Sequence, residues 1–279
     1  MSAWDARESA TAGAAPVYVA SPDGPWDLVQ DRFATAGRVV VHTTWGAWAP
    51  AALLDPQLRQ VLGQDWPRYR QAPRAGQRLG FAASRHVMKY TVAAVLEIPV
   101  QTIDFTFRPG GRPGVRGWDE LALSLAHTDE LLVVGVSRTG PVGVDAERAD
   151  RSIPFDLMGE EVCTPAEAAR LAALPEEGRR AGLLRLWTLK EAYTKALGYG
   201  LRHSFSRVGF EEDADGRTRL AAPAPDIDAW TFDTHRVLDR YLVSEAHRGA
   251  LPGPSAASPS AAGAAGATAP GDEGPRDRA

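Results

Sequence analysis

The chain has 279 residues, of which 44% are hydrophobic and 24% charged, with a formal net charge of −4 and an isoelectric point near 5.9. This balance is typical of a globular protein and disfavours nucleic acid as the main partner, because phosphate-backbone binding normally requires a basic surface. Cys163 is the only cysteine, which excludes an intrachain disulfide and favours a cytoplasmic location. No stretch is apolar enough to predict a signal peptide or a membrane-spanning helix.

Both ends of the chain have compositions that predict disorder. Residues 1–16 are small and polar, and residues 249–279 consist mainly of Ala, Gly, Pro and Ser. Such segments bury too little apolar surface to offset their conformational entropy. Between them we expect two folded halves, residues 17–142 and residues 143–248.

In the first half, a helix is predicted before a set of strands. Apolar residues at helical spacing indicate a helix over 80–98, with Arg85 and Lys89 one turn apart on another face. Residues 101–109, 121–127 and 130–137 have the patterns of strands. The RTGP segment at 138–141 predicts a turn, so we expect the next strand, 142–147, to form a hairpin with 130–137.

The second half repeats this order. Thr164, Pro165 and Glu167 predict a helix start with a capping box, and a second helix over 181–197 should end at a left-handed cap on Gly198. Strand-like runs follow at 206–212, 228–236 and 239–247. We therefore expect an α+β fold of two similar halves, each with a helix and an antiparallel sheet.

Two carboxylates stand at alternate positions of the strand at 142–147. Side chains alternate faces along a strand, so Asp145 and Glu147 project the same way with Cα atoms roughly 6.6 Å apart. They can bind one cation together, or they can be two solvated acids at a strand end. The pair alone does not decide between these interpretations.

The helix at 181–197 carries a third acid with two lysines. Trp187, Glu191 and Lys195 follow at steps of four and share one helical face. Glu followed by Lys at this spacing is also an ordinary exposed ion pair. Lysine usage favours a special role, since the chain has three lysines against 28 arginines and two of the three flank Glu191. Two acids from the strand and one from the helix can surround a hard cation, and the lysines can lie beside a bound phosphate. This arrangement indicates magnesium-dependent phosphoryl-type transfer.

The motifs GVDAE at 143–147 and WTLKEAYTK at 187–195 resemble the two signatures of the 4′-phosphopantetheinyl transferases. A third family element is matched by Gly111-Arg112-Pro113 and, in part, by Ser124-Leu125-Ala126-His127, where Ser124 and Ala126 replace the family's usual Asn and Ser. The resemblance covers roughly residues 80–247. The length and the repeated order of elements favour the long, monomeric Sfp-type class, whose two halves form a pseudo-dimer related by a twofold axis with the active site at their interface.

This resemblance implies transfer of the phosphopantetheine arm of coenzyme A to a serine of an apo acyl or peptidyl carrier protein, with release of adenosine 3′,5′-bisphosphate. It implies Mg²⁺, with Mn²⁺ as a substitute. Charge and hydropathy, as above, predict neither nucleic acid nor membrane as a partner. Metal ligands are expected at Asp145, Glu147 and Glu191, and catalytic roles for Glu191 and Lys195. Contacts to coenzyme A are expected from Arg85, Lys89, Arg112, Pro113, Ala126, His127, Lys190 and Lys195.

Several of these residues can instead have purely structural or solvent-exposed roles. His127 can be structural, Arg112 can be a solvated turn residue, and Arg85 with Lys89 can be a polar helix face. Cys163 and Trp187 are expected to be structural. For the whole chain, the alternatives are a non-catalytic module that binds coenzyme A or a carrier protein, and another metal-dependent phosphotransferase with a nucleotide substrate.

Overall fold

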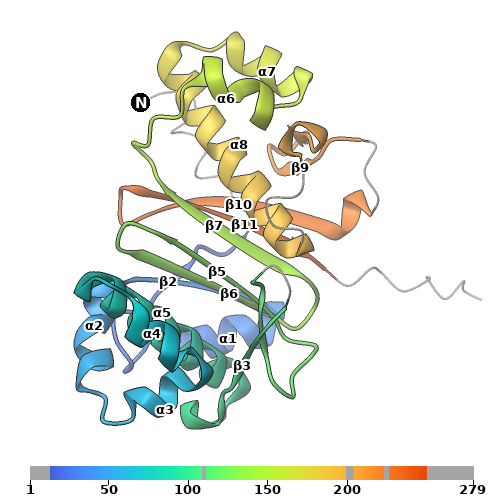
Figure 1. The fold of residues 1–279 in the computed structure, drawn as a ribbon. Helices are drawn as coiled ribbons and strands as arrows, with labels where there is room; N and C mark the ends of the chain where they lie inside the picture. The colour runs from blue at the N-terminus through green and yellow to red at the C-terminus, as the bar shows by residue number, and fades with distance from the viewer. Residues whose placement is uncertain (1–12, 109–110, 199–203, 223–225, 250–279) are drawn as a thin grey trace, which may run out of the picture.

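The computed structural model describes residues 13–108, 111–198, 204–222 and 226–249. Two sheets face each other in the centre, and helices cover the outer face of each sheet (Figure 1). The N-terminal half lies on one side of this sandwich and the C-terminal half on the other. Where the chain is described, no helix is both long and apolar enough to cross a bilayer.

The first sheet has the order β1-β2-β6-β5. Its strands are β1 (Val17–Tyr18), β2 (Arg38–Thr44), β5 (Ala122–Thr128) and β6 (Leu131–Ser137). The β1 and β2 strands are parallel and the other pairs are antiparallel. Helices of this half are α1 (Trp26–Ala36), α2 (Trp45–Leu54), α3 (Leu58–Leu62), α4 (Trp66–Gln71) and α5 (Ala75–Leu96), with 3₁₀ turns at Gly63–Asp65 and Val100–Thr102. A short hairpin of β3 (Phe105–Phe107) and β4 (Pro113–Val115) follows α5.

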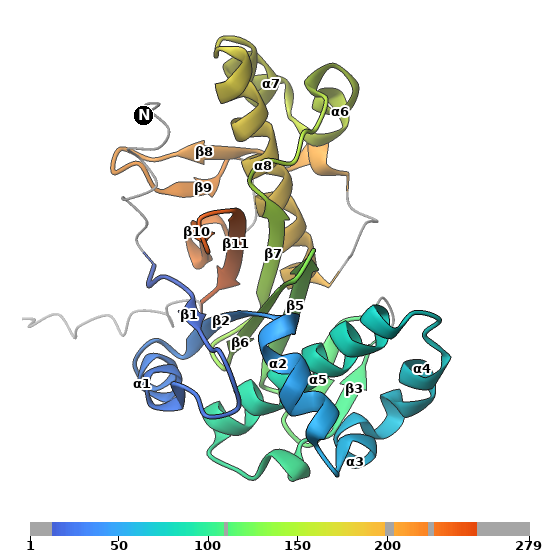
Figure 2. The same ribbon diagram turned by 90° about the vertical axis from the view of Figure 1, so that its left-hand side faces the viewer.

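The second sheet has the order β10-β11-β7 and is fully antiparallel. Its strands are β7 (Val142–Arg148), β10 (Trp230–Val237) and β11 (Tyr241–Arg248). Helices of this half are α6 (Phe155–Val162), α7 (Pro165–Ala172) and α8 (Glu176–Leu197), with 3₁₀ turns at Phe205–Arg207 and Ile227–Ala229. A short hairpin of β8 (Phe210–Glu212) and β9 (Thr218–Leu220) follows α8 (Figure 2).

The same order of elements therefore occurs in both halves. After β1 and α1 of the first half, each half has one strand, several helices ending in a 22-residue helix, a short hairpin and then two long strands. The corresponding strands also have the same neighbours, since β2-β6-β5 matches β7-β11-β10. This supports the predicted α+β class with antiparallel sheets.

The expected hairpin between 130–137 and 142–147 is wrong. Strand β6 pairs with β5 and β2, whereas β7 pairs with β11 in the other sheet. The turn at 138–141 thus carries the chain from one half to the other. Both strands are almost entirely buried. Their apolar patterns fit a face-to-face contact between sheets as well as they fit a hairpin.

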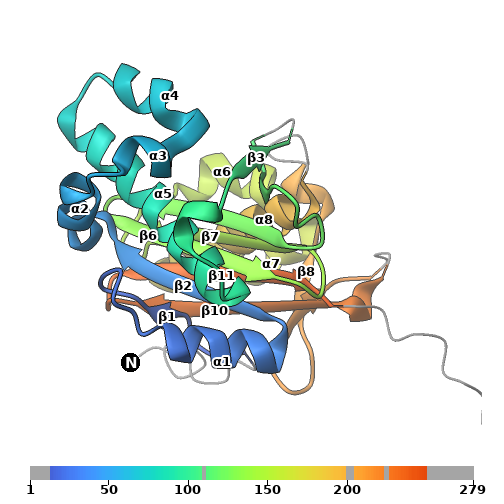
Figure 3. The ribbon, with the colours of Figure 1, turned by 90° about the horizontal axis from the view of Figure 1, so that it is seen from below.

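Three apolar layers hold the sandwich together. One lies between the first sheet and its helices, and another between the second sheet and α8. The third fills the space between the sheets. It contains Val40, Ala126, Leu131, Val133, Val144, Ala146, Val237, Tyr241 and Val243. Packing between these side chains fixes the position of one half against the other. Figure 3 shows the strands of the two sheets overlapping when the molecule is seen from below.

One edge of the space between the sheets is polar. The guanidinium of Arg38 on β2 donates to Glu245 of β11 at 3.0 Å, and the ring of His247 lies 3.0 Å from the Thr139 hydroxyl. Glu245 is buried, and this burial raises its pKa to about 7 even though Arg38 favours the charged form. Burial also lowers the pKa of His247 to about 4. The halves are thus joined by a buried polar cluster as well as by apolar contacts.

Local sequence signals agree with the structure at several positions. Thr164 and Glu167 form the predicted capping box at the start of α7, and Gly198 ends α8 in the left-handed conformation with φ 77°. Cys163 is buried, and burial raises the pKa of its thiol to about 11, as an inert structural cysteine requires. The predicted disordered ends lie outside the described residues, apart from residues 13–16 and 249. Of these, Gly13 donates its N–H to Asp233.

Candidate active site

Strand β7 places its two acids on the face that packs against α8. This packing is unusually close, because a Cβ on Gly143 would lie 1.9 Å from the carbonyl oxygen of Ala192. Alternation then turns Asp145 and Glu147 to the same side. The Gly of the GVDAE motif therefore lets the helix and the strand come together, and the acids that follow it face the helix.

Asp145 is buried and is paired on one side only. Its Oδ1 accepts a hydrogen bond from Lys195 Nζ at 2.7 Å, and the same ammonium donates to the carbonyl of Val144 at 3.1 Å. Its Oδ2 is buried without a partner among the described residues. Burial raises the pKa of Asp145 although the charge of Lys195 opposes this shift. An unpaired, buried carboxylate oxygen beside an open acid cluster is a ready ligand for a cation.

Glu147 has both oxygens in use. One oxygen pairs with the guanidinium of Arg151, and the other accepts from the Thr128 hydroxyl of β5 at 3.4 Å. Burial raises the pKa of Glu147, with a contribution from the charge of Asp145, while Arg151 opposes the shift. Thr128 thus connects the acid to the other half of the molecule.

Glu191 on α8 is the third acid of the site. Burial raises its pKa, and the negative charges of Asp145 and Glu147 raise it further, while Lys195 opposes them. The three carboxylates are therefore close enough to interact electrostatically. Within the described part of the chain, the Glu191 carboxylate has no hydrogen bond or ion pair.

These acids do not yet form a closed coordination shell. Over the residues that the structure describes, no three His, Cys, Asp or Glu side chains are gathered tightly enough to hold a metal ion. The donor set nevertheless fits Mg²⁺ or Mn²⁺, which prefer a few carboxylate oxygens completed by water and phosphate. The free Oδ2 of Asp145 and the unpaired Glu191 provide oxygens for such an ion.

His127 lies at the rim of the same site. Its side chain is exposed at the end of β5. Partial desolvation, followed by the positive charges of Lys195 and Arg85, lowers its pKa, whereas Asp145 acts in the opposite direction. The neighbouring Ser124 joins the two halves, since its Oγ accepts the N–H of Val144 at 3.0 Å. The charges of Lys195 and Asp145 thus act on His127, and its expected contact to coenzyme A stays a prediction.

Arg85 and Lys89 are buried side by side on α5 rather than exposed on a polar face. Arg85 pairs with Asp65, and its guanidinium lies 4.5 Å from the ring centroid of Phe81. Burial lowers the pKa of Lys89, while Asp104 and Asp65 oppose this. Arg85 is therefore paired with a protein carboxylate before any anion binds, whereas the Lys89 ammonium is buried with only the more distant charges of Asp104 and Asp65 to favour it.

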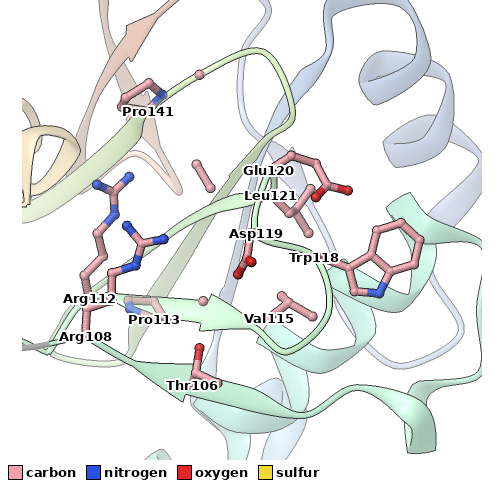
Figure 4. Close-up of a pocket in the computed structure, with 13 residues that line it drawn as sticks. Thr106, Arg108, Arg112, Pro113, Val115, Trp118, Asp119, Glu120, Leu121 and Pro141 are labelled. Atoms are coloured by element: carbon pink, nitrogen blue, oxygen red, sulfur yellow. The ribbon is translucent and has the colours of Figure 1, made fainter.

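Arg112 and Pro113 line a cavity of about 240 Å³ between the β3–β4 hairpin and the segment at 140–141 (Figure 4). Arg112 and Arg108 stand together on one side of it, and Asp119 and Trp118 lie across from them. Arg112 also donates to the carbonyl of Ala196 at 3.0 Å, near the end of α8. The alternative interpretation of Arg112 as a solvated turn residue is therefore wrong, and its expected contact to coenzyme A stays a prediction.

Lys190 and Ala126 are not placed to contact a cofactor through their side chains. The Lys190 ammonium is fully enclosed and donates to the carbonyls of Val162 (2.6 Å) and Phe205 (3.1 Å) and to Glu167 (2.6 Å). These contacts occupy its three donors. Its position next to Glu191 in the sequence turns it toward the interior of the helical layer. The methyl group of Ala126 is buried between the sheets.

Sequence reasoning missed three contributors to the site. Ser124 and Thr128 come from β5, and Arg151 follows β7. Ser124 was noted only as a substitution within a motif, and an Arg four residues after Glu147 carries no signal of its own. Their roles arise from the contact between the halves.

Comparisons with known proteins agree on one family. Residues 141–246 match the model of the 4′-phosphopantetheinyl transferase superfamily. The chain is 30% identical over 146 residues to the 4′-phosphopantetheinyl transferase psf-1 of Bacillus pumilus, covering 52% of this chain and 59% of that protein. It is 28% identical over 127 residues to 4′-phosphopantetheinyl transferase HetI of Nostoc, covering 44% and 54%. The chain thus spans little more than half the length of these relatives.

A solved structure also aligns with part of the chain. The holo-ACP-synthase from Plasmodium yoelii covers 41% of this chain and 97% of its own, with 16% identity and a TM-score of 0.32.

Proposed function

Because the chain belongs to the 4′-phosphopantetheinyl transferase superfamily, we propose that it transfers the 4′-phosphopantetheine arm of coenzyme A to a serine of an apo carrier protein. The acceptor is an acyl or peptidyl carrier domain, and the other product is adenosine 3′,5′-bisphosphate. The proposal includes dependence on Mg²⁺ and a pseudo-twofold relation between the two halves. It rests above all on one observation, the meeting of Asp145, Glu191 and Lys195 from two distant motifs at the contact of β7 with α8.

Residues of this chain supply the binding and proton-transfer steps. Asp145, Glu147 and Glu191 would hold the magnesium ion, whose role is to neutralise charge on the pyrophosphate. Lys195 places a positive charge beside that pyrophosphate. His127 lies close enough to Lys195 for that charge to lower its pKa. Arg85 and Lys89 lie further along the same half, and Arg112 with Pro113 offers the 240 Å³ cavity to the nucleotide end.

Glu191 acts as the general base in this proposal. Its carboxylate takes the proton of the serine hydroxyl as the oxygen attacks the phosphorus that carries the pantetheine arm. The bond from that phosphorus to the bridging oxygen breaks, and the electron pair leaves with adenosine 3′,5′-bisphosphate. Among the described residues, the Glu191 carboxylate has no hydrogen bond or ion pair, so one of its oxygens is available to accept the proton. Lys195 stabilises the negative charge that develops during transfer.

The direct test is mass spectrometry of apo carrier proteins incubated with coenzyme A, Mg²⁺ and the full chain. We expect a mass gain of ~340 Da on the carrier serine, the size of the transferred arm. The Asp145→Ala variant should abolish this gain while coenzyme A binding remains measurable, which separates an enzyme from a module that only binds. Absence of the gain on fatty-acid, polyketide and nonribosomal-peptide carriers alike would refute the proposal.

A further inference from the structure

We propose that Arg151 is a resident counter-cation of the acid cluster, which a divalent ion must displace from Glu147, and that it thereby sets the metal affinity of the site. This inference rests on the proposed function, since it takes the metal site as its starting point. It assigns to Arg151 a positioning role toward the metal ligands.

The two acids of β7 differ in how much of each carboxylate is free. Asp145 has one buried oxygen without a partner among the described residues, so a cation can bind there while Lys195 keeps the other oxygen. Glu147 has no such free oxygen, because Arg151 holds one and Thr128 the other. The contact with Thr128 is long at 3.4 Å, so the guanidinium is the main competitor of an incoming ion.

The charge of Arg151 acts on two of the expected metal-binding carboxylates, Glu147 and Asp145. It opposes the rise in pKa of Glu147 and, to a smaller extent, that of Asp145. A positive charge that stabilises these carboxylates without metal also repels a divalent cation that approaches them. Arg151 therefore has two effects of the same sign, occupation of an oxygen and electrostatic repulsion.

The surroundings of Arg151 allow its side chain to move away from Glu147. Its guanidinium carbon lies 5.8 Å from the ring centroid of Trp187, close enough for a cation–π contact. Trp187 precedes Glu191 by one helical turn, so the ring stands on the same face of α8 as the third acid. The Arg151 side chain is 46% exposed, whereas that of Glu147 is 15% exposed. The guanidinium can therefore move into water when an ion takes its place on Glu147.

The test is a titration of the full chain with MnCl₂ alone, without coenzyme A, in which free Mn²⁺ is measured by electron paramagnetic resonance. We expect Arg151→Gln to bind Mn²⁺ at least about tenfold more tightly, since one charge at contact distance shifts ionic equilibria by a factor of ten or more. Arg151→Lys keeps the charge and should stay within about threefold of the wild type. Arg148→Gln is the matched control, because Arg148 pairs with Asp150 and Asp129. The Mn²⁺ affinity of this variant should equal that of the wild type.

Equal or weaker Mn²⁺ binding by Arg151→Gln would overturn the inference, as would an equal tightening in Arg151→Lys. Arg151→Met repeats the measurement if Arg151→Gln does not fold. Asp145→Ala separates this inference from the proposed function. If Asp145→Ala still binds Mn²⁺ as the wild type does, the metal site itself is misassigned. If it loses binding while Arg151→Gln binds as the wild type does, only the role of Arg151 fails.

Discussion

Replacing Lys190 with methionine should destabilise the protein strongly without weakening its affinity for coenzyme A. The Lys190 side chain is fully buried, and its partner Glu167 is 1% exposed. Lys190 Nζ and Glu167 Oε2 lie 2.6 Å apart. Glu167 also accepts the N–H groups of Thr164 (2.7 Å) and Phe210 (2.8 Å). The pair thus connects α8 to the start of α7 and to the β8–β9 hairpin. Lys190→Met leaves a buried carboxylate without its cation and the Val162 carbonyl without the ammonium donor, whereas the Phe205 carbonyl keeps the N–H of Val208 at 3.1 Å.

Breaking a buried pair from one side costs about 3–5 kcal/mol, so we expect this loss in the free energy of unfolding. For a chain of this size it corresponds to a fall in Tm of about 6–20 °C. The assays are urea unfolding followed by circular dichroism and thermal melting. Below its Tm, the variant should keep the KM for coenzyme A within about threefold of the wild type, because KM changes when substrate contacts are removed.

Lys89→Met provides the matched control. Burial lowers the pKa of the Lys89 ammonium, so loss of its charge should leave Tm unchanged or raise it. A double variant, Glu167→Leu with Lys190→Met, should recover part of the lost stability, because it removes both buried charges. A loss below about 1 kcal/mol in Lys190→Met would refute the reasoning. A selective rise in the KM for coenzyme A at full stability would instead restore Lys190 as a cofactor contact.

Three further predictions concern other positions. Burial raises the pKa of Glu245 to about 7, so the folded state binds its proton more tightly, and this residue's contribution to stability should fall by about 3 kcal/mol between pH 4.5 and 7. Urea unfolding of the wild type and of Glu245→Gln across that pH range measures this change. If the free energies of unfolding of the two proteins have the same pH dependence, the prediction is wrong. Gly143→Ala should cost more than about 2 kcal/mol and most of the activity, because its Cβ meets backbone of α8. An active, fully stable variant would show that α8 can shift. Cys163 should react with a thiol reagent only on unfolding, and fast labelling of the native protein would disprove its burial.

Much of the local structure follows from the sequence alone. The capping box at Thr164 and Glu167, the end of α8 at Gly198 and the strand that carries Asp145 and Glu147 depend on neighbours within a few residues. Such signals are short-range, because a cap or an alternating face is determined by the backbone conformation of one element. The two motifs also predicted that the acids and Lys195 form one group, and the contact of Lys195 with Asp145 agrees with this prediction.

The relation between the elements was decided only by the tertiary structure. Strand β7 was expected beside β6 but lies in the other sheet, because a largely buried strand satisfies either arrangement. Lys190 was expected at the cofactor, yet the helix turns it into the core, where Glu167 compensates its charge. Arg151 reaches Glu147 only because a chain reversal after β7 brings it back over Trp187. Side-chain identity determines what each group can do chemically, whereas packing between elements distant in sequence determines which groups meet.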